Sequence, residues 1–204
     1  AGKASLDAGF DSAVIDLVKL PLEENIKLTK QCVEYARELE KKENREILIE
    51  AELGFIGTSS KILDKIPDGV GEDTMTTPED AKYFVEATGI DLLAPSIGNV
   101  HGMVKTGNPR LHPERVKAIR LATGIPLVLH GGSGSMDEDF ISCIKEGIDI
   151  IHINTEIRVA FTNALRQSLA DNPEEITPYK YLPKAVEAVE KVVESRLRLF
   201  SGMK

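Results

Sequence analysis

Short apolar runs alternate with helical stretches along this chain, and the alternation restricts it to an α/β fold. Five runs are rich in Ile, Val and Leu, a composition typical of parallel strands that are covered on both faces. We therefore expect strands at residues 10–16, 46–53, 91–98, 126–129 and 148–153.

Helical patterns separate these strands. We expect helices at residues 21–41, from Thr77 onward, at 113–123, from a capping box at Ser135 to Glu146, at 155–170 and at 182–200. The segment 54–76 is rich in Gly, Ser and Asp without a clear pattern, which is typical of an active-site lid.

Two architectures fit five βα units followed by a terminal helix. One is a five-stranded doubly wound sheet, and the other is part of a (β/α)₈ barrel, which typically needs about 250 residues. Periodicity alone leaves both open. No linker interrupts the chain, so we expect residues 1–204 to form a single domain.

The net charge of the chain limits the kinds of molecule that it can bind. The 204 residues carry a net charge of −8, which disfavours nucleic acid and anionic membranes but permits a small phosphorylated ligand held by backbone amides. No apolar run approaches the roughly 18 residues of a membrane span. Cys32 and Cys143 form no CxxC pair, which favours free thiols in a reducing compartment, and we predict a cytoplasmic protein.

Titratable side chains stand at the expected strand ends. Carboxylates and imidazoles are ligands that zinc takes, and iron or manganese to a lesser extent. His101 and His130 each end an apolar run before a glycine, so we expect them to converge within a few ångströms at the carboxyl edge of the sheet. The other strand-end candidates are Asp16, Glu52 and His152.

Simpler interpretations remain open for some of these residues. Asp16 would equally cap a turn, and Glu50 competes with Glu52 because both point to the same side of a strand. His152 fits a hydrogen-bonded core histidine as well as a ligand contact.

Glycine-rich turns suggest an anion site beside the histidines. The turn Gly131-Gly132-Ser133-Gly134 leads into a helix, so its N–H groups and the Ser133 hydroxyl could converge on phosphate oxygens. Asn154-Thr155 forms a second candidate cradle at a helix start. Lys105 would supply a cation there, or is simply a solvated loop lysine.

These motifs together resemble a known family. They are Ala8-Gly9-Phe10-Asp11-Ser12, Leu20-Pro21-Leu22-Glu23-Glu24-Asn25-Ile26, Glu52-Leu53-Gly54, Gly98-Asn99-Val100-His101-Gly102, Leu129-His130-Gly131-Gly132-Ser133-Gly134 and Ile153-Asn154-Thr155-Glu156. From about residue 7 to 200, the sequence resembles the zinc-dependent class II aldolases that act on fructose and tagatose bisphosphates.

The resemblance implies a (β/α)₈ barrel that is dimeric or larger, with Zn²⁺ or another divalent metal. It implies that His101 and His130 bind the metal and that Asp16 and Glu52 hold a second metal position. It further implies that the ketose phosphate is bound by Gly102, by Gly131, Gly132 and Ser133, and by His152, Asn154 and Thr155. Carbonyls near the histidines would hold a monovalent cation, K⁺ or Na⁺.

The chain departs from the family pattern in three places. No Asp-His dipeptide, the family's acid/base and third zinc ligand, occurs in it. We therefore expect the chain to cover strands 4–8 of the barrel, and its own catalytic residues stay unassigned. Gly57-Thr58-Ser59-Ser60 stands where the lid often has Gly-Gly-x-Glu-Asp, and His152 stands where asparagine is usual.

The resemblance implies a lyase of glycolysis and gluconeogenesis. It would cleave fructose 1,6-bisphosphate into dihydroxyacetone phosphate and glyceraldehyde 3-phosphate. Tagatose bisphosphate is an alternative substrate, and a noncatalytic sugar-phosphate-binding barrel fragment is an alternative function. Because the acid/base pair is missing, we expect little or no turnover from these 204 residues alone. A nucleotide-binding domain is disfavoured, because no GxGxxG follows the first strand.

Overall fold

A parallel sheet of five strands forms the centre of the structure, a computed structural model that describes residues 2–203. Its strands are β1 (Ser12–Ile15), β2 (Leu48–Leu53), β4 (Leu92–Pro95), β6 (Leu127–Leu129) and β7 (Ile148–Ile151). They lie side by side in the order β1-β2-β4-β6-β7. All five predicted strands are therefore confirmed. The order never reverses, unlike that of a doubly wound sheet.

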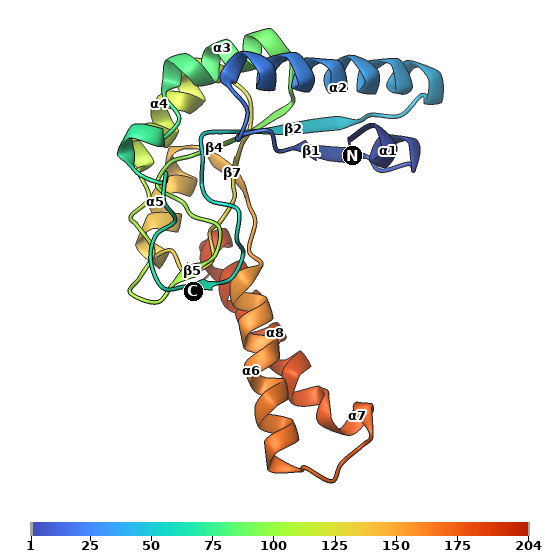
Figure 1. The fold of residues 1–204 in the computed structure, drawn as a ribbon, viewed down its shortest axis with the longest axis vertical. Helices are drawn as coiled ribbons and strands as arrows, with labels where there is room; N and C mark the ends of the chain where they lie inside the picture. Colours follow the sequence, from blue (N-terminus) through green and yellow to red (C-terminus); the bar gives the residue numbers. More distant parts are fainter. Residues whose placement is uncertain (1, 204) are drawn as a thin grey trace.

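Helices cover one face of this sheet. They are α1 (Gly2–Asp7), α2 (Leu22–Glu43), α3 (Pro78–Thr88), α4 (Pro113–Thr123) and α5 (Asp137–Glu146). Figure 1 shows α2 to α5 following one another along the outer side of the curved sheet. Their buried side chains, among them Phe84, Ile119 and Phe140, form one core with alternate strand residues such as Ile49, Leu93 and Leu127.

Local signals explain where most of these helices begin and end. The Thr77 hydroxyl accepts a hydrogen bond from Asp80 N at 3.0 Å, Pro78 occupies the first turn, and Gly89 ends α3 in the left-handed conformation with φ 71°. Gly124 ends α4 in the same way, with φ 70°.

The capping box predicted at Ser135 is wrong. Helix α5 begins at Asp137 with Met136 as its N-cap, and no side chain caps it. Ser135 instead belongs to the preceding turn, where its N–H donates to Gly132 O at 3.0 Å. A residue closing that turn is not free to act as the helix cap.

The other face of the sheet differs from expectation. Side chains alternate along a strand, so Val14, Glu50 and Ile150 point away from the helices. Val14 is 46% exposed and Ile150 is 39% exposed. Burial on both faces, predicted from the apolar sequence, is therefore confirmed for β4, for β6 and for β2 from Ile49 onward, and it is wrong for the two edge strands β1 and β7.

The segment 54–76 is more ordered than its composition predicts. It contains β3 (Ile62–Leu63), which pairs in parallel with β5 (Met103–Val104), and the short 3₁₀ helix η1 (Glu72–Thr74). His101 N also donates to Ile56 O at 2.8 Å. These bonds hold the segment against the loop that carries His101.

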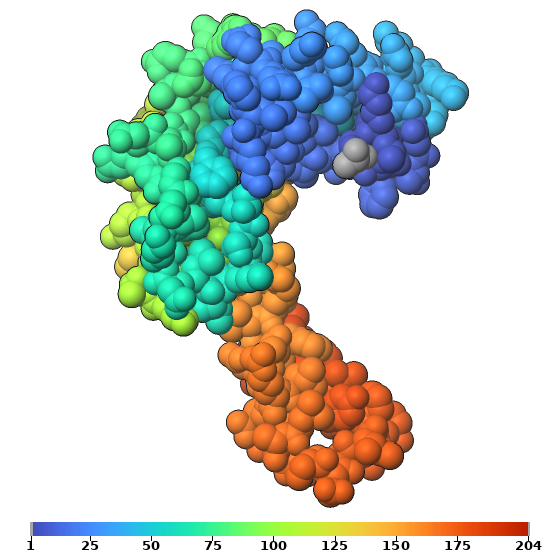
Figure 2. Space-filling view, in the orientation of Figure 1, coloured from blue at the N-terminus to red at the C-terminus, as the bar shows by residue number. Residues whose placement is uncertain are grey.

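A helical arm extends from the body. It consists of α6 (Thr155–Asp171), α7 (Pro178–Tyr181) and α8 (Pro183–Ser201). Figures 1 and 2 show α6 running outward and α8 returning beside it. The arm is anchored where Phe200 packs edge-on against Phe140, with ring centroids 5.1 Å apart. The two long helices predicted near the C-terminal end are confirmed.

Within residues 2–203, no helix combines the length and apolar character needed to cross a membrane.

The burial pattern of α4 predicts a sharp contrast between two similar substitutions. Ile119 is fully buried, whereas Leu121 is 78% exposed on the same helix. We expect Ile119→Ala to lower the free energy of unfolding by about 2–5 kcal/mol, because it leaves a cavity, and Leu121→Ala to change it by less than about 0.5 kcal/mol. Urea unfolding monitored by circular dichroism measures both. Equal effects would contradict this assignment of the core.

Candidate metal and anion site

Strand β2 places two carboxylates on the face that the helices leave free. Ile49, Ala51 and Leu53 belong to the core beneath the helices, so Glu50 and Glu52 point to the opposite side. Both glutamates are 5% exposed. Glu52 is in register with Ala94 on β4. The small side chain of Ala94 leaves room for other groups above β4.

His130 follows β6 and lies between the two carboxylates. Its Nδ1 is 2.8 Å from Glu52 Oε1, and its Nε2 is 2.6 Å from Glu50 Oε1. Its backbone carbonyl accepts a hydrogen bond from Asn99 Nδ2 at 2.9 Å, which fixes the start of the glycine turn. The structure therefore selects neither glutamate over the other: both contact the same ring.

The two negative charges control the protonation of this ring. Burial opposes the charged form of His130, but its close contacts with the negative carboxylates of Glu50 and Glu52 outweigh this effect and raise the pKa of His130 to about 9. Without a metal, the ring is therefore an imidazolium at neutral pH.

His101 lies on the loop between β4 and β5 and faces His130. The two ring centroids are 6.0 Å apart, in line with the expected convergence. His101 Nδ1 is 2.9 Å from Gly57 O. A carbonyl only accepts hydrogen bonds, so Nδ1 carries the hydrogen and Nε2 keeps a free lone pair.

Glu52, His101 and His130 fit a divalent metal. One ligand atom from each lies within 4.8 Å of the others. Two imidazoles and a carboxylate are a donor set that zinc uses in catalytic sites. The bond from His101 to Gly57 is the kind of outer support that orients a metal-bound histidine.

His152 follows β7 and stacks on His130 with ring centroids 4.6 Å apart. Desolvation and the positive charge of His130 lower the pKa of His152, so this ring is neutral where His130 is charged. His152 is exposed and lies on the wall of the cavity, unlike the buried core histidine that was the alternative.

A cavity of about 170 Å³ lies beside the histidines. It is lined by Ser60, His101, Gly102, His130, Gly131, Ser133, His152, Asn154 and Thr155. Ser133 Oγ accepts hydrogen bonds of 3.3 Å from Asn154 N and Glu156 N at the start of α6. The hydroxyl oxygen therefore accepts hydrogen bonds at the N-terminus of α6, which is where a helix commonly binds an anion.

The glycines after the histidines permit close backbone contact. Gly131 has φ +62°, and a Cβ atom there would lie 2.6 Å from the backbone of Val100. A Cβ atom on Gly102 would lie 2.5 Å from Lys61 O. These glycines are thus required where the two histidine loops and the segment 54–76 meet.

Three predicted residues lie apart from the cavity wall. Gly132 faces the core beside Phe140. Lys105 is paired with Asp64 at 2.6 Å on the surface. Asp16 is exposed, its Oδ1 accepts a hydrogen bond from Val18 N at 3.4 Å, and it joins neither metal-ligand group found among the described residues.

Sequence reasoning missed the supporting residues of the site. Ser60 lines the cavity from the segment 54–76, and only the expectation of a lid pointed to it. Asn108 links the two loops, because its Nδ2 donates to Ser133 O at 2.8 Å and its Oδ1 accepts from Val104 N at 2.8 Å. No periodic pattern marks such a loop residue.

Fold and site together define a parallel α/β protein with a candidate metal and anion site at the carboxyl ends of its strands. The chain belongs to the class-II fructose-bisphosphate aldolase family, whose sequence profile, described as "Fructose-bisphosphate aldolase class-II", matches residues 2–203.

Curated fructose-bisphosphate aldolases are similar in sequence to this chain. The fructose-bisphosphate aldolase of Geobacillus stearothermophilus is 41% identical over 201 residues, which cover 98% of this chain and 66% of that protein. That of Staphylococcus aureus is 40% identical over 198 residues, which cover 97% of this chain and 65% of the relative. The chain therefore spans just under two thirds of the length of these relatives.

Solved structures agree with the fold. The YdjI aldolase from Escherichia coli K12 superposes with a TM-score of 0.73 at 34% identity, over 96% of this chain and 63% of that one. A fructose-bisphosphate aldolase from Campylobacter jejuni gives a TM-score of 0.71 over 98% of this chain and 64% of that one. At 24% identity the second comparison shows the fold alone.

The environment of His130 predicts how stability depends on pH. A raised histidine pKa stabilises the metal-free fold fully below about pH 6.5, and this contribution is lost as the pH rises through about 9. We expect the free energy of unfolding to fall by an amount on the order of 2–3 kcal/mol across that range. Urea unfolding in EDTA measures it. Glu50→Gln should flatten the dependence, and an unchanged slope would contradict the assignment.

Proposed function

We propose that this protein is a metal-dependent aldolase that cleaves fructose 1,6-bisphosphate into dihydroxyacetone phosphate and glyceraldehyde 3-phosphate. One observation carries the proposal: the Glu52–His101–His130 group borders the same cavity as Ser133 and the N-terminus of α6. The carbonyl and the phosphate of one substrate molecule could then be held side by side, the carbonyl at the metal and the phosphate at the N-terminus of α6.

The anion-binding side of the cavity would orient the substrate. Helix α6 has 17 residues, so its N-terminus carries a substantial positive partial charge. We assign the phosphate to the N–H groups of Gly132, Ser133 and Asn154, with Gly102, Gly131 and Thr155 beside it; a phosphate oxygen would replace Ser133 Oγ as the acceptor for Asn154 N. Fixing the phosphate holds the reacting carbons in one position, which lowers the entropic part of the barrier.

The metal-binding side would polarise the substrate. A divalent ion such as Zn²⁺ acts there as a Lewis acid on the ketose carbonyl. Glu52, His101 and His130 would bind the ion, and Asp16 would contribute to a second position on the same face of the sheet. His152 would contact the substrate from the cavity wall.

We also propose that the chain shares the family's barrel architecture, assembly and monovalent-cation site. We assign its five strands to strands 4–8 of a (β/α)₈ barrel and expect one domain over residues 1–204. We also propose a cytoplasmic homo-oligomer, with a monovalent cation held by carbonyls near the histidines. The sequential strand order supports the barrel assignment, because barrel strands follow one another in order.

An aldolase assay on the purified protein tests the function directly. Release of glyceraldehyde 3-phosphate is coupled to a dehydrogenase, and tagatose 1,6-bisphosphate is compared at the same concentration. Because residues 1–204 contain no Asp-His pair, the expected result is weak turnover that disappears with EDTA and returns with Zn²⁺. Zinc and phosphate binding without turnover of either sugar would instead favour a noncatalytic binding protein.

Two serines in the glycine turn provide a matched test of the anion site. Ser133 Oγ contacts the N-terminus of α6, whereas Ser135 Oγ is buried and lies outside the cavity lining. We expect Ser133→Ala to weaken binding of dihydroxyacetone phosphate by about 1 kcal/mol, or about fivefold, because one neutral hydrogen bond is lost. Calorimetry should show no change for Ser135→Ala, and equal effects would contradict the assignment.

A further inference from the structure

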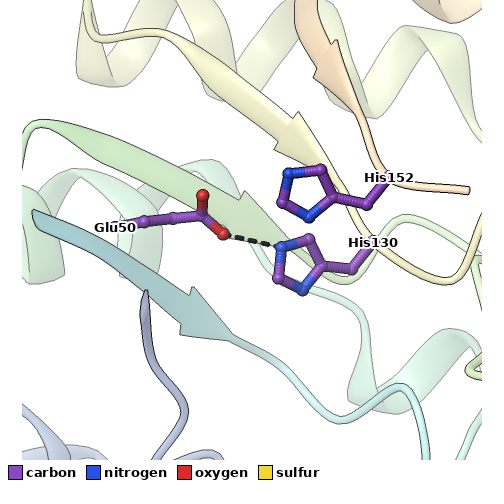
Figure 3. Close-up of side chains that lie close together, drawn as sticks. All are labelled: Glu50, His130 and His152. Carbon is purple, nitrogen blue, oxygen red and sulfur yellow. Dashed lines mark ion pairs between the residues drawn. The ribbon is translucent and has the colours of Figure 1, made fainter. Parts of the chain in front are cut away.

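Two groups of potential metal ligands share the ring of His130. The first contains Glu52 and His101, and the second contains Glu50 and His152. In the second group, as in the first, one ligand atom from each residue lies within 4.8 Å of the others. Figure 3 shows Glu50 and His152 on the side of His130 that carries Nε2.

The second group has unsatisfied polar atoms. Glu50 Oε1 and His130 Nε2 are both buried, and neither makes a properly aligned hydrogen bond with any described residue. They nevertheless lie 2.6 Å apart. Buried polar atoms are nearly always hydrogen-bonded, so two such atoms in contact without an aligned hydrogen bond suggest a common partner beside both of them.

The charge of the buried cluster points to a cation. Glu50 and Glu52 are both 5% exposed, and His130 is the sole ion-pair partner of either glutamate within residues 2–203. Two carboxylates therefore share a single imidazole ring in a buried place. Burying carboxylates without a matching cation is unfavourable, and a bound metal ion would compensate them.

The donor atoms define the kind of cation. Two imidazoles and a carboxylate suit Zn²⁺ or a related divalent transition ion better than the all-oxygen preference of Ca²⁺ or Mg²⁺. Because His152 is exposed, it opens this group to solvent and can turn toward an entering ion.

We propose that Glu50, His130 and His152 form a second binding site for a divalent transition-metal ion, distinct from the Glu52–His101–His130 group. The proposal does not depend on the aldolase activity, since it concerns only which side chains hold the ion.

Sharing His130 makes the two positions mutually exclusive. A neutral imidazole has one free lone pair and one N–H group. An ion at Nε2 leaves the Nδ1–H group to donate to Glu52, and an ion at Nδ1 leaves the Nε2–H group to donate to Glu50. Each state is thus a carboxylate–histidine–metal arrangement, and the glutamate not bound to the ion supports the ring.

Histidine substitutions separate the two sites. Zinc binding to the metal-free purified protein is measured by calorimetry at neutral pH for wild type, His101→Asn, His152→Asn and the double variant. His112→Asn is the matched control, because His112 pairs with Glu114 and belongs to neither group. Circular dichroism and thermal melting check that each variant is folded.

We expect one equivalent of zinc in wild type, in the control and in each single variant. Adding His152→Asn to His101→Asn should weaken binding by about 100-fold or more, because a lost ligand matters at least as much as a lost outer-shell partner. With Co²⁺ as the probe, the two single variants should give different visible spectra, because they retain different ligands.

Two results would overturn the proposal. One is a folded His101→Asn variant that binds no zinc, and the other is a double variant that binds zinc as tightly as His101→Asn. Two equivalents bound to wild type at neutral pH would refute the mutual exclusion. Failure of the aldolase assay with these binding results intact would count only against the proposed activity.

Discussion

The contact of one imidazole with two buried carboxylates governs the arrangement of the site. Strand alternation forces Glu50 and Glu52 to the face opposite the helices, because Ile49, Ala51 and Leu53 fill the core. His130 reaches both glutamates from the end of β6. Unpaired buried charges are unfavourable. Neither β2 nor the turn after β6 can therefore shift without exposing a carboxylate or leaving it without its partner.

Close backbone contact between loops adds a second constraint. Gly131 meets the Val100 backbone and Gly102 meets the carbonyls of residues 59 and 61, so three loops from distant parts of the chain pack together without side chains between them. A glycine-rich turn is usually taken to indicate anion binding. In this chain the same glycines also set the distance between the histidine loops, which determines the ligand geometry.

The sequence predicted the sheet and most of the helices because each depends on local signals. The apolar runs mark β1, β2, β4, β6 and β7, and Thr77 with Pro78 marks the start of α3. The placement of His101 and His130 followed from a topological rule about strand ends. Periodicity could not reveal β3 and β5, which have two residues each and form only by pairing with one another. It also could not separate Glu50 from Glu52, because both alternate to the same face.

One arginine connects the helical arm to the proposed anion site. Arg196 on α8 forms a bidentate contact with Glu156, at 2.7 and 2.8 Å, and also contacts Asp137 at 2.7 Å. Glu156 lies in the first turn of α6, where a free carboxylate would repel a phosphate held by Ser133 and Asn154. Pairing with Arg196 neutralises that charge and leaves the N–H groups of the helix as the main electrostatic feature facing the cavity. The return of α8 from the arm to the body therefore serves the site as well as the core, because it brings this cation to the start of α6.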